Sequence, residues 1–388
     1  MASLLIKNCR FHNAWRADQV ESILIRDGII TGVGKAPSGI RADQVIDAGG
    51  RTVAPGFIDV HIQGAGGADV LDATPEALET ISRTCVRFGV TSFLATTVYK
   101  PGQDNDHLKV VAKCAGREFD GADMLGVHLE GPFIASERRG MIQPDCLGEA
   151  SPAILDEIYG LLGDGLKMMT VAPELPGAAK IVQTLVERGT VASFGHSKAT
   201  YEETIRGFDM GINHVTHLFN AMLSLHHREP GPLGAIFERP EVTCQVITDG
   251  VHSHPAVLRL AFKALGPERF VTITDGIQAM GLPDGKYVYN DIEYESKDGA
   301  ARYKDGTLIG TALGLSQLLS RLARATQCSL SNAIKTVTEN PAQVLGIEKK
   351  KGKIMPQYDA DIVILEEDMS IWMTIAAGRV VYQQEGEA

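Results

Sequence analysis

The chain has 388 residues, a net charge of -11 and a sequence pI near 5.5. It shows no basic stripe that would suit nucleic acid, so we expect a small-molecule substrate. No apolar stretch is long enough to cross a bilayer, and the beginning of the chain lacks the basic and apolar regions of a signal peptide. Six cysteines are scattered without a CxxC pair, which favours reduced thiols in a cytoplasm.

Both ends of the chain resemble pieces of one small β domain. Strand-like segments between Leu4 and Ile46 are broken by Asp27-Gly28, a hairpin signature, and similar segments recur over 361–365 and 373–382. We therefore expect a β-sandwich assembled from residues 1–54 and 346–388. The part between them, residues 55–345, is long enough for one large barrel of roughly 250 residues.

Eight short apolar runs cross this central part, as strands buried on both faces should. Helix-like stretches separate most of them, and this alternation predicts an α/β fold in which βα units close a parallel (β/α)8 barrel. Thr74-Pro75-Glu76 and Ser151-Pro152 have the pattern of helix starts. The runs are Val53 to His61, Val90 to Tyr99, Met124 to Glu130, Met168 to Glu174, Val191 to His196, Ile212 to His217, Val242 to Asp249 and Phe270 to Asp275.

Five of these runs end in ionisable residues: His61, Glu130, His196, His217 and Asp275. In such a barrel the carboxyl ends of the strands converge on one mouth, where the chemistry occurs. One glutamate and two histidines form a known ligand set for catalytic zinc, so Glu130, His196 and His217 are the candidate metal ligands. Taken singly, each is explained as well by a satisfied core residue. Three at equivalent strand ends favour the metal site.

Asp275 ends the last of these strands, where a carboxylate facing a metal-activated water can take its proton. The alternative for Asp275 is a helix cap or a turn. His128 should lie deeper in the barrel on the same strand face as Glu130, and His214 should point elsewhere, so both are interpreted as structural or ligand-orienting groups. His226 and His227 look like loop residues.

A set of motifs in this order resembles the amidohydrolase superfamily, and more closely the N-acetylglucosamine-6-phosphate deacetylase family. The resemblance covers nearly the whole chain. Its markers are Ala54-Pro55-Gly56-Phe57-Ile58-Asp59-Val60, His128-Leu129-Glu130-Gly131-Pro132-Phe133, Gly195-His196-Ser197, Thr216-His217-Leu218-Phe219-Asn220-Ala221-Met222, Arg228-Glu229-Pro230-Gly231, Asp249-Gly250-Val251-His252, Thr274-Asp275 and Gly306-Thr307-Leu308.

The resemblance implies that Glu130, His196 and His217 hold the principal divalent metal, for which zinc is the expected ion, and that Asp275 activates the attacking water. It also implies that Asn220, the Ala221 backbone, His252 and Arg228 bind the sugar phosphate, with the arginine reaching across a homodimer interface. A guanidinium suits phosphate. The alternative for Arg228 is a surface ion pair with Glu229, and His252 with His254 offers a rival second metal pair.

The chain departs from the family at the end of the first strand, where two-metal members carry His-x-His and this chain reads His61-Ile62-Gln63. We therefore expect one tightly bound ion per subunit, with His61 binding a second ion weakly or not at all and Gln63 as a candidate substrate contact. The strand ending at Glu174 lacks the lysine that bridges two ions in hydantoinases and dihydroorotases.

The second departure from the family pattern concerns residues that would determine substrate specificity. Ile142 stands where many members carry a histidine that contacts a sugar hydroxyl, and Ile309 also differs from the small-residue pattern, so both are candidate substrate contacts. The sequence predicts a deacetylase of an N-acetylated amino sugar 6-phosphate. The alternatives are hydrolysis of another N-acyl amino sugar, either a galacto epimer or an unphosphorylated one, and a catalytically silent sugar-phosphate sensor.

Overall fold

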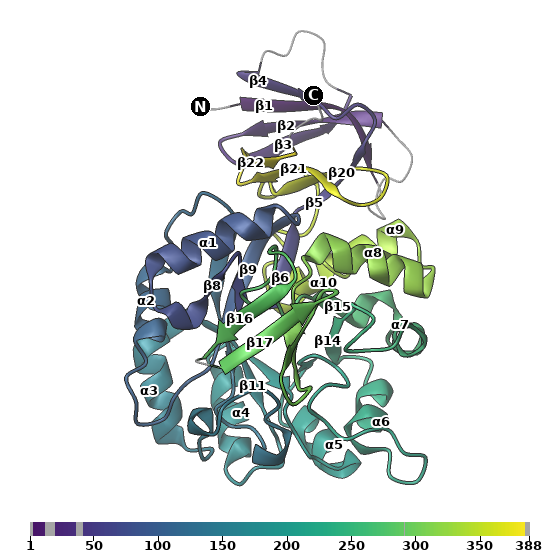
Figure 1. Ribbon diagram of the computed structural model, residues 1–388. Coiled ribbons are helices and arrows are strands. Elements are labelled where there is room, and N and C mark those ends of the chain that lie inside the picture. Colours follow the sequence, from purple (N-terminus) through teal and green to yellow (C-terminus); the bar gives the residue numbers. More distant parts are fainter. Residues whose placement is uncertain (1–2, 12–19, 36–41, 291, 385–388) are drawn as a thin grey trace.

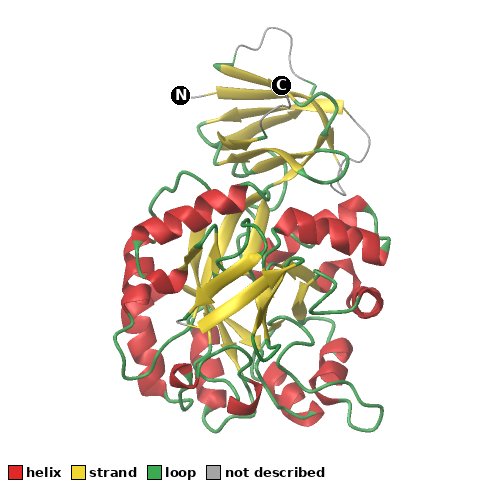
Figure 2. Cartoon of the chain, in the orientation of Figure 1, coloured by secondary structure: helices red, strands yellow, loops and turns green. Residues whose placement is uncertain are grey.

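The computed structural model describes residues 3–11, 20–35, 42–290 and 292–384. A barrel of parallel strands surrounded by helices forms the larger part. A small β domain built from segments near both ends of the chain stands beside it (Figures 1 and 2). Among the described residues, none of the helices is both long and apolar enough to span a membrane.

Eight neighbouring parallel strands form the barrel, which confirms the predicted fold class. The backbone N–H of Asp275 donates to the carbonyl of His61 at 2.9 Å, and this bond joins the last strand to the first. The strands are β6 (Phe57–Ile62), β9 (Val90–Thr97), β10 (Asp123–Glu130), β11 (Leu166–Val171), β12 (Val191–Phe194), β13 (His214–Val215), β14 (Thr243–Ile247) and β15 (Phe270–Ile273).

Helices cover the outside of the barrel (Figure 2). Thr74 caps α1 by accepting a hydrogen bond from the N–H of Ala77 at 3.1 Å, as the sequence indicates, whereas Ser151 precedes α3 without a side-chain cap. The α-helices are α1 (Pro75–Val86), α2 (Asp106–Cys114), α3 (Pro152–Leu162), α4 (Ala178–Glu187), α5 (Tyr201–Asp209), α6 (Gly231–Glu238), α7 (Pro255–Arg269), α8 (Leu315–Thr326), α9 (Leu330–Lys335) and α10 (Glu339–Val344). Short 3-10 turns are η1 (Val70–Asp72), η2 (Ser136–Arg138), η3 (Pro144–Cys146) and η4 (Gly163–Gly165).

The small domain is one hydrogen-bonded sheet in the order β22-β21-β20-β5-β1-β2-β3, with β4 paired to β1. Strands from both ends of the chain share its apolar core, in which Ile6, Ile25, Ile362 and Ile375 are fully buried or nearly so. Its strands are β1 (Ser3–Phe11), β2 (Val20–Arg26), β3 (Ile29–Gly34), β4 (Gln44–Asp47), β5 (Thr52–Pro55), β20 (Ile362–Leu365), β21 (Ile371–Ala376) and β22 (Arg379–Gln383).

One predicted run serves both domains. The apolar segment from Val53 to His61 is interrupted at Gly56, so that β5 joins the small sheet and only β6 enters the barrel. The interruption has a steric reason, because a Cβ at Gly56 would lie 2.1 Å from the hydroxyl of Thr91 in the neighbouring strand.

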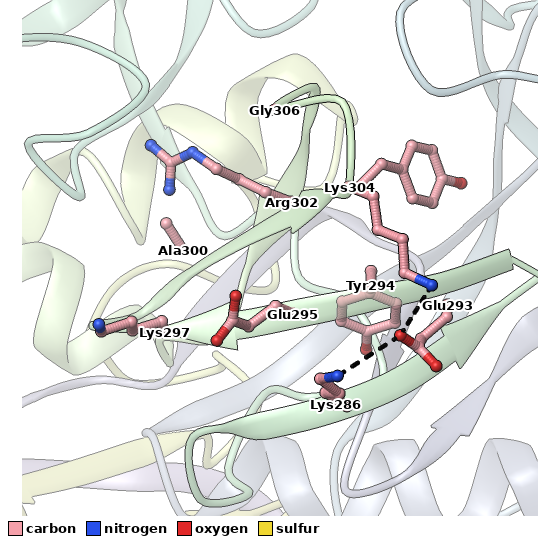
Figure 3. A pocket seen from close by; sticks show the side chains of 10 residues that line it. Lys286, Glu293, Tyr294, Glu295, Lys297, Ala300, Arg302, Lys304 and Gly306 are labelled. Carbon is pink, nitrogen blue, oxygen red and sulfur yellow. Dashed lines mark ion pairs between the residues drawn. The ribbon is translucent and has the colours of Figure 1, made fainter.

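A four-stranded antiparallel sheet between β15 and α8 was not anticipated. It comprises β16 (Gly285–Tyr289), β17 (Ile292–Lys297), β18 (Ala300–Tyr303) and β19 (Leu308–Thr311), and it lies in front of the barrel in Figure 1. Figure 3 shows a charged pocket on this insert, where Glu293 pairs with Lys286 and Lys304. Buried Tyr294 alternates along β17 with exposed Glu293 and Glu295.

A two-stranded ribbon, β7 (Gly64–Ala65) and β8 (Ala68–Asp69), follows β6.

Candidate active site

Three of the predicted metal ligands lie together at the mouth of the barrel. Glu130 is the last residue of β10, and His196 and His217 each lie two residues beyond the ends of β12 and β13. Their exposed fractions are only 3–4%. The Oε1 atom of Glu130 lies 2.9 Å from Nε2 of His196 and 3.0 Å from Nε2 of His217, and the two Nε2 atoms are 3.0 Å apart.

The donor chemistry of this cluster suits a divalent metal ion. Nδ1 of His196 donates to the carbonyl of Arg138 at 2.8 Å, so in a neutral imidazole the lone pair lies on Nε2. That lone pair faces the carboxylate of Glu130. Two acceptors at this distance repel each other unless a proton or cation lies between them. Among the described residues, these three form the group that is arranged to hold an ion.

The cluster also changes the protonation of its members. Burial by itself raises the pKa of Glu130, but the positive charge of His61 and the contacts with His196 and His217 together outweigh it and bring the pKa well below its usual value. Burial lowers the pKa of His217. A carboxylate that stays ionised beside a neutral imidazole is the form in which both can bind a cation.

Asp275 lies across the cavity, immediately after β15, with 12% of its side chain exposed. Its Oδ1 atom lies 3.2 Å from Nε2 of His61 and accepts a hydrogen bond from Nε2 of Gln63 at 3.3 Å. Asp275, His196 and His217 all have positive φ angles, 47°, 47° and 28°. Left-handed backbone at non-glycine residues is uncommon and concentrates at functional sites.

His61 is fully buried beside the group of three ligands but is not part of it. Nδ1 of His61 hydrogen-bonds to Oε1 of Gln245 at 2.9 Å, and Nε2 lies 3.7 Å from Oε1 of Glu130. Burial by itself lowers the pKa of His61, but the negative charges of Asp275 and Glu130 outweigh it and raise the pKa to about 9. Its Nε2 atom thus faces two carboxylates.

A cavity of about 190 Å³ opens above these groups. Several predicted substrate contacts line it, namely Gln63, Asn220, Ala221, His252 and Ile309. Nδ1 of His252 hydrogen-bonds to Oδ2 of buried Asp249 at 2.7 Å, which leaves Nε2 as the other polar atom of the ring.

Two predicted substrate contacts are placed differently. Ile142 does not line the cavity; it is buried in a cluster with Val98, Ile134 and Cys146, and its neighbour Met141 lines the cavity instead. Arg228 is exposed on the loop before α6, where its guanidinium bonds Nε2 of His227 at 2.7 Å. A site within one subunit therefore does not include Arg228.

Three further histidines occupy structural positions. His128 is fully buried, and its Nε2 bonds the hydroxyl of Thr170 at 2.8 Å. His214 bonds the hydroxyl of Thr243 at 2.6 Å. His254 caps α7 through its Nδ1, which separates it from His252 in role.

Sequence reasoning missed Tyr289 and Gln245, which bond the side chains of Gln63 and His61. It also passed over Asp59, which lies in one of the quoted motifs and accepts a hydrogen bond from the hydroxyl of Thr274 at 2.6 Å. Burial raises the pKa of Asp59 to about 6. The only available signal was an unexplained carboxylate in a buried strand.

A barrel whose strand ends present Glu, His, His and Asp in this arrangement defines the amidohydrolases, and residues 52–381 match the amidohydrolase family. The chain belongs to that family and is a hydrolase.

Similar proteins narrow the assignment. The chain is 32% identical over 385 residues to N-acetylglucosamine-6-phosphate deacetylase of Lysinibacillus sphaericus, covering 98% of each chain. It is also 32% identical to N-acetylgalactosamine-6-phosphate deacetylase of Escherichia coli O157:H7, covering 89% of this chain and 91% of the relative. A variant of N-acetyl-D-glucosamine-6-phosphate deacetylase from Mycobacterium smegmatis, solved in complex with N-acetyl-D-glucosamine-6-phosphate, has a TM-score of 0.88 at 29% identity and covers 98% and 99% of the two chains. The chain belongs to the N-acetylglucosamine-6-phosphate deacetylase family.

Proposed function

We propose that this chain hydrolyses the acetamide of an N-acetylated amino sugar 6-phosphate, with N-acetylglucosamine 6-phosphate as the first substrate to test. The observation that carries the proposal is the convergence of Glu130, His196 and His217 within 3.0 Å, with the carboxylate of Asp275 lining the same cavity. The two curated relatives, of which the chain covers 98% and 91%, are named as deacetylases of such substrates.

Glu130, His196 and His217 would hold one divalent ion, which we propose to be zinc because imidazole and carboxylate suit it. When bound, such an ion polarises the amide carbonyl and lowers the pKa of water. We expect one stoichiometric ion per subunit, because Gln63 supplies a neutral amide where a second site would need a stronger ligand. His61 would then act chiefly on Asp275, and His61→Ala should reduce activity moderately.

Asp275 would carry the proton. In the first step the water oxygen bonds to the acetamide carbon, and Asp275 accepts the proton that the water releases. In the second step the C–N bond breaks, and Asp275 gives this proton to the departing nitrogen. The products are acetate and the free amino sugar phosphate.

The phosphate would bind where the backbone after β13 offers N–H groups. His217, Phe219 and Ala221 have positive φ, whereas Leu218 and Asn220 do not. The N–H groups of Leu218 and Asn220 already donate to the carbonyls of Gln245 and His217 at 2.8 and 2.9 Å, so we propose those of Phe219 and Ala221 as the backbone donors to the anion. We propose that His252 adds a further polar contact, and that Arg228 of a second subunit completes the phosphate site in a homodimer. Because all six cysteines are free thiols, we also propose a cytoplasmic location.

The test is acetate release by metal-reconstituted enzyme from N-acetylhexosamines with and without the 6-phosphate. Asp275→Asn should lower kcat by at least about a hundredfold while KM changes little, because the loss is in proton transfer. A wild-type enzyme that binds these sugars but releases no acetate would instead support a silent sensor.

The galacto epimer is the second candidate. The galactosamine relative is as similar to this chain, at 32% identity, as the Lysinibacillus glucosamine enzyme. Met141 and Ile309 give the cavity apolar contacts rather than a hydrogen-bond donor. A higher kcat/KM for N-acetylgalactosamine 6-phosphate would put this candidate first.

A further inference from the structure

We propose that Tyr289, on the antiparallel insert, is a positioning residue for this hydrolysis, because it fixes Gln63 and Gln63 in turn orients Asp275. The inference rests on the proposed function. The hydroxyl of Tyr289 donates to Oε1 of Gln63 at 2.9 Å, and Nε2 of Gln63 donates to Oδ1 of Asp275 at 3.3 Å. The three residues lie on three separate segments: the end of β16, the loop after β6 and the loop after β15.

Chemistry fixes the direction of this chain of hydrogen bonds. An ionised carboxylate only accepts hydrogen bonds, so the amide NH2 of Gln63 must face Asp275. Its carbonyl oxygen is then left for Tyr289, whose hydroxyl must donate. Burial, with the charge of Asp69 adding to it, holds the pKa of Tyr289 well above its usual value, so the hydroxyl keeps its proton.

Gln63 is held firmly enough to transmit this constraint. Its side chain is 3% exposed. Its backbone N–H donates to the carbonyl of Gly276 at 2.8 Å, and its carbonyl accepts from the N–H of Val70 at 3.0 Å. The backbone of Gln63 is therefore bonded to Gly276, the residue that follows Asp275, while its side-chain amide is bonded to Asp275 itself. Precise placement of a reacting group depends on such supporting contacts.

Asp275 has a left-handed backbone and lies beyond the end of β15, so the regular strand does not hold it in place and its orientation depends on side-chain contacts. Oδ1 faces both Gln63 and His61. Among the residues that the structure describes, no hydrogen bond to Oδ2 is found, so this oxygen is available to take a proton from water. Without the bond from Gln63, the carboxylate could turn part of the way about its bond to the rest of the side chain, which would move the unbonded oxygen out of line with the water.

Tyr294 supplies a matched control. It lies on β17, the strand that pairs with β16 in the insert, and it is 1% exposed in the same apolar cluster as Tyr289. Its side chain is drawn in Figure 3. Its hydroxyl bonds neither Gln63 nor Asp275 within the described part of the chain. Changing either tyrosine to phenylalanine removes one buried oxygen, but only Tyr289→Phe breaks the link to Asp275.

The experiment compares kcat, KM, metal content and thermal stability for Tyr289→Phe, Tyr294→Phe, Gln63→Met and the double variant Tyr289→Phe/Gln63→Met. We expect Tyr289→Phe to lower kcat roughly tenfold or more with KM and metal content nearly unchanged, since misplacement of a reacting group affects the chemical step. Tyr294→Phe should retain wild-type kcat. In the Gln63→Met background, Tyr289→Phe should cause no further loss.

Three results would overturn the inference: equal loss of kcat in both tyrosine variants, independent losses in the double variant, or loss of metal from Tyr289→Phe. Each of these requires an active wild-type enzyme. A wild-type enzyme that releases no acetate would instead overturn the proposed function, and the role of Tyr289 with it, so the two failures are distinguishable.

Discussion

His196, His217 and Asp275 all have backbone conformations that their residue types seldom adopt. Such conformations cost on the order of 1–3 kcal/mol each and persist where the surroundings determine them. Hydrogen bonds across the barrel supply that determination, since the N–H of Asp275 is bonded to the carbonyl of His61 and Nδ1 of His196 to that of Arg138. The strain lies in the residues to which we assign the chemistry.

Removal of one metal ligand should remove the ion and the activity together. His196→Ala and His217→Ala each delete one of three converging atoms, and Glu130→Gln replaces a charged carboxylate by a neutral amide, so we expect metal content and kcat to fall in parallel. His226→Ala, which changes an exposed histidine, is the control. Metal analysis after dialysis makes the measurement, and a ligand variant with full occupancy and full turnover would exclude that residue from the site.

Arg228→Ala tests whether a second subunit contributes to phosphate binding. Because a phosphate contact is the same in the ground state and the transition state, the variant should raise KM about tenfold or more and leave kcat nearly unchanged. The measurement is repeated on the unphosphorylated sugar, where no effect is expected. Equal weakening of both substrates would make the arginine structural and would favour an unphosphorylated substrate.

At the scale of elements, the barrel was predictable because strands buried on both faces form continuous apolar runs. The insert was not recognised, because charged residues interrupt the apolar runs of β16, β17 and β18. The alternation Glu293-Tyr294-Glu295-Ser296-Lys297 was nevertheless a usable strand signal.

The candidate site shows the same division. Residues at strand ends could be predicted, since parallel strands must converge there. The contact of Tyr289 with Gln63 could not, because 226 residues separate them and only the packing of the insert brings them together. Ile142 was inferred from its place in a motif, and a motif does not determine which of two neighbouring side chains faces the cavity.

Gly310 in β19 links the insert to the site. Its φ is +135°, and a Cβ there would lie 2.5 Å from the carbonyl oxygen of Asp275. Gly310→Ala should therefore displace the backbone of Asp275 and lower kcat at least about tenfold. Gly306→Ala is the matched control, because its φ is also positive, at +89°, with no atom within 4 Å.

Assays of kcat and thermal unfolding on these two glycine variants separate strain from displacement. Both should lose about 1 kcal/mol through the unfavourable φ. Only Gly310→Ala should lose catalysis. Similar kcat values in the two variants would show that Asp275 tolerates the shift.

At the scale of the whole molecule, Lys351, which lies between α10 and β20, pairs with two carboxylates just before β20. Its Nζ lies 2.5 Å from Oδ2 of Asp361 and 3.3 Å from Oδ2 of Asp359, with 12% of the side chain exposed. Burial by itself lowers the pKa of Lys351, but the charge of Asp361 outweighs it and the net pKa is raised.

Lys351→Met should destabilise the protein by about 3 kcal/mol at pH 7, because it leaves buried Asp361 and partly exposed Asp359 without their cation. A raised pKa means that the stabilisation is fully present below the unfolded-state pKa of lysine and is lost as pH rises through the folded-state value. The difference in the free energy of unfolding between wild type and variant, measured with urea, should hence narrow above about pH 10. A gap that stays constant into that range would assign the loss to packing.

The small sheet has a consequence for the order in which the chain is made. β5 lies between β1 and β20, so the strands of residues 3–55 cannot complete their sheet until residues 362–383 have left the ribosome. During synthesis of the barrel, one edge of β5 has no partner, and an open strand edge can pair with another chain. The first strands of the small sheet therefore stay incompletely paired until its last strands have been synthesised. A stop codon shortly before residue 362 should yield aggregates, even though such a product would contain every residue of the candidate active site.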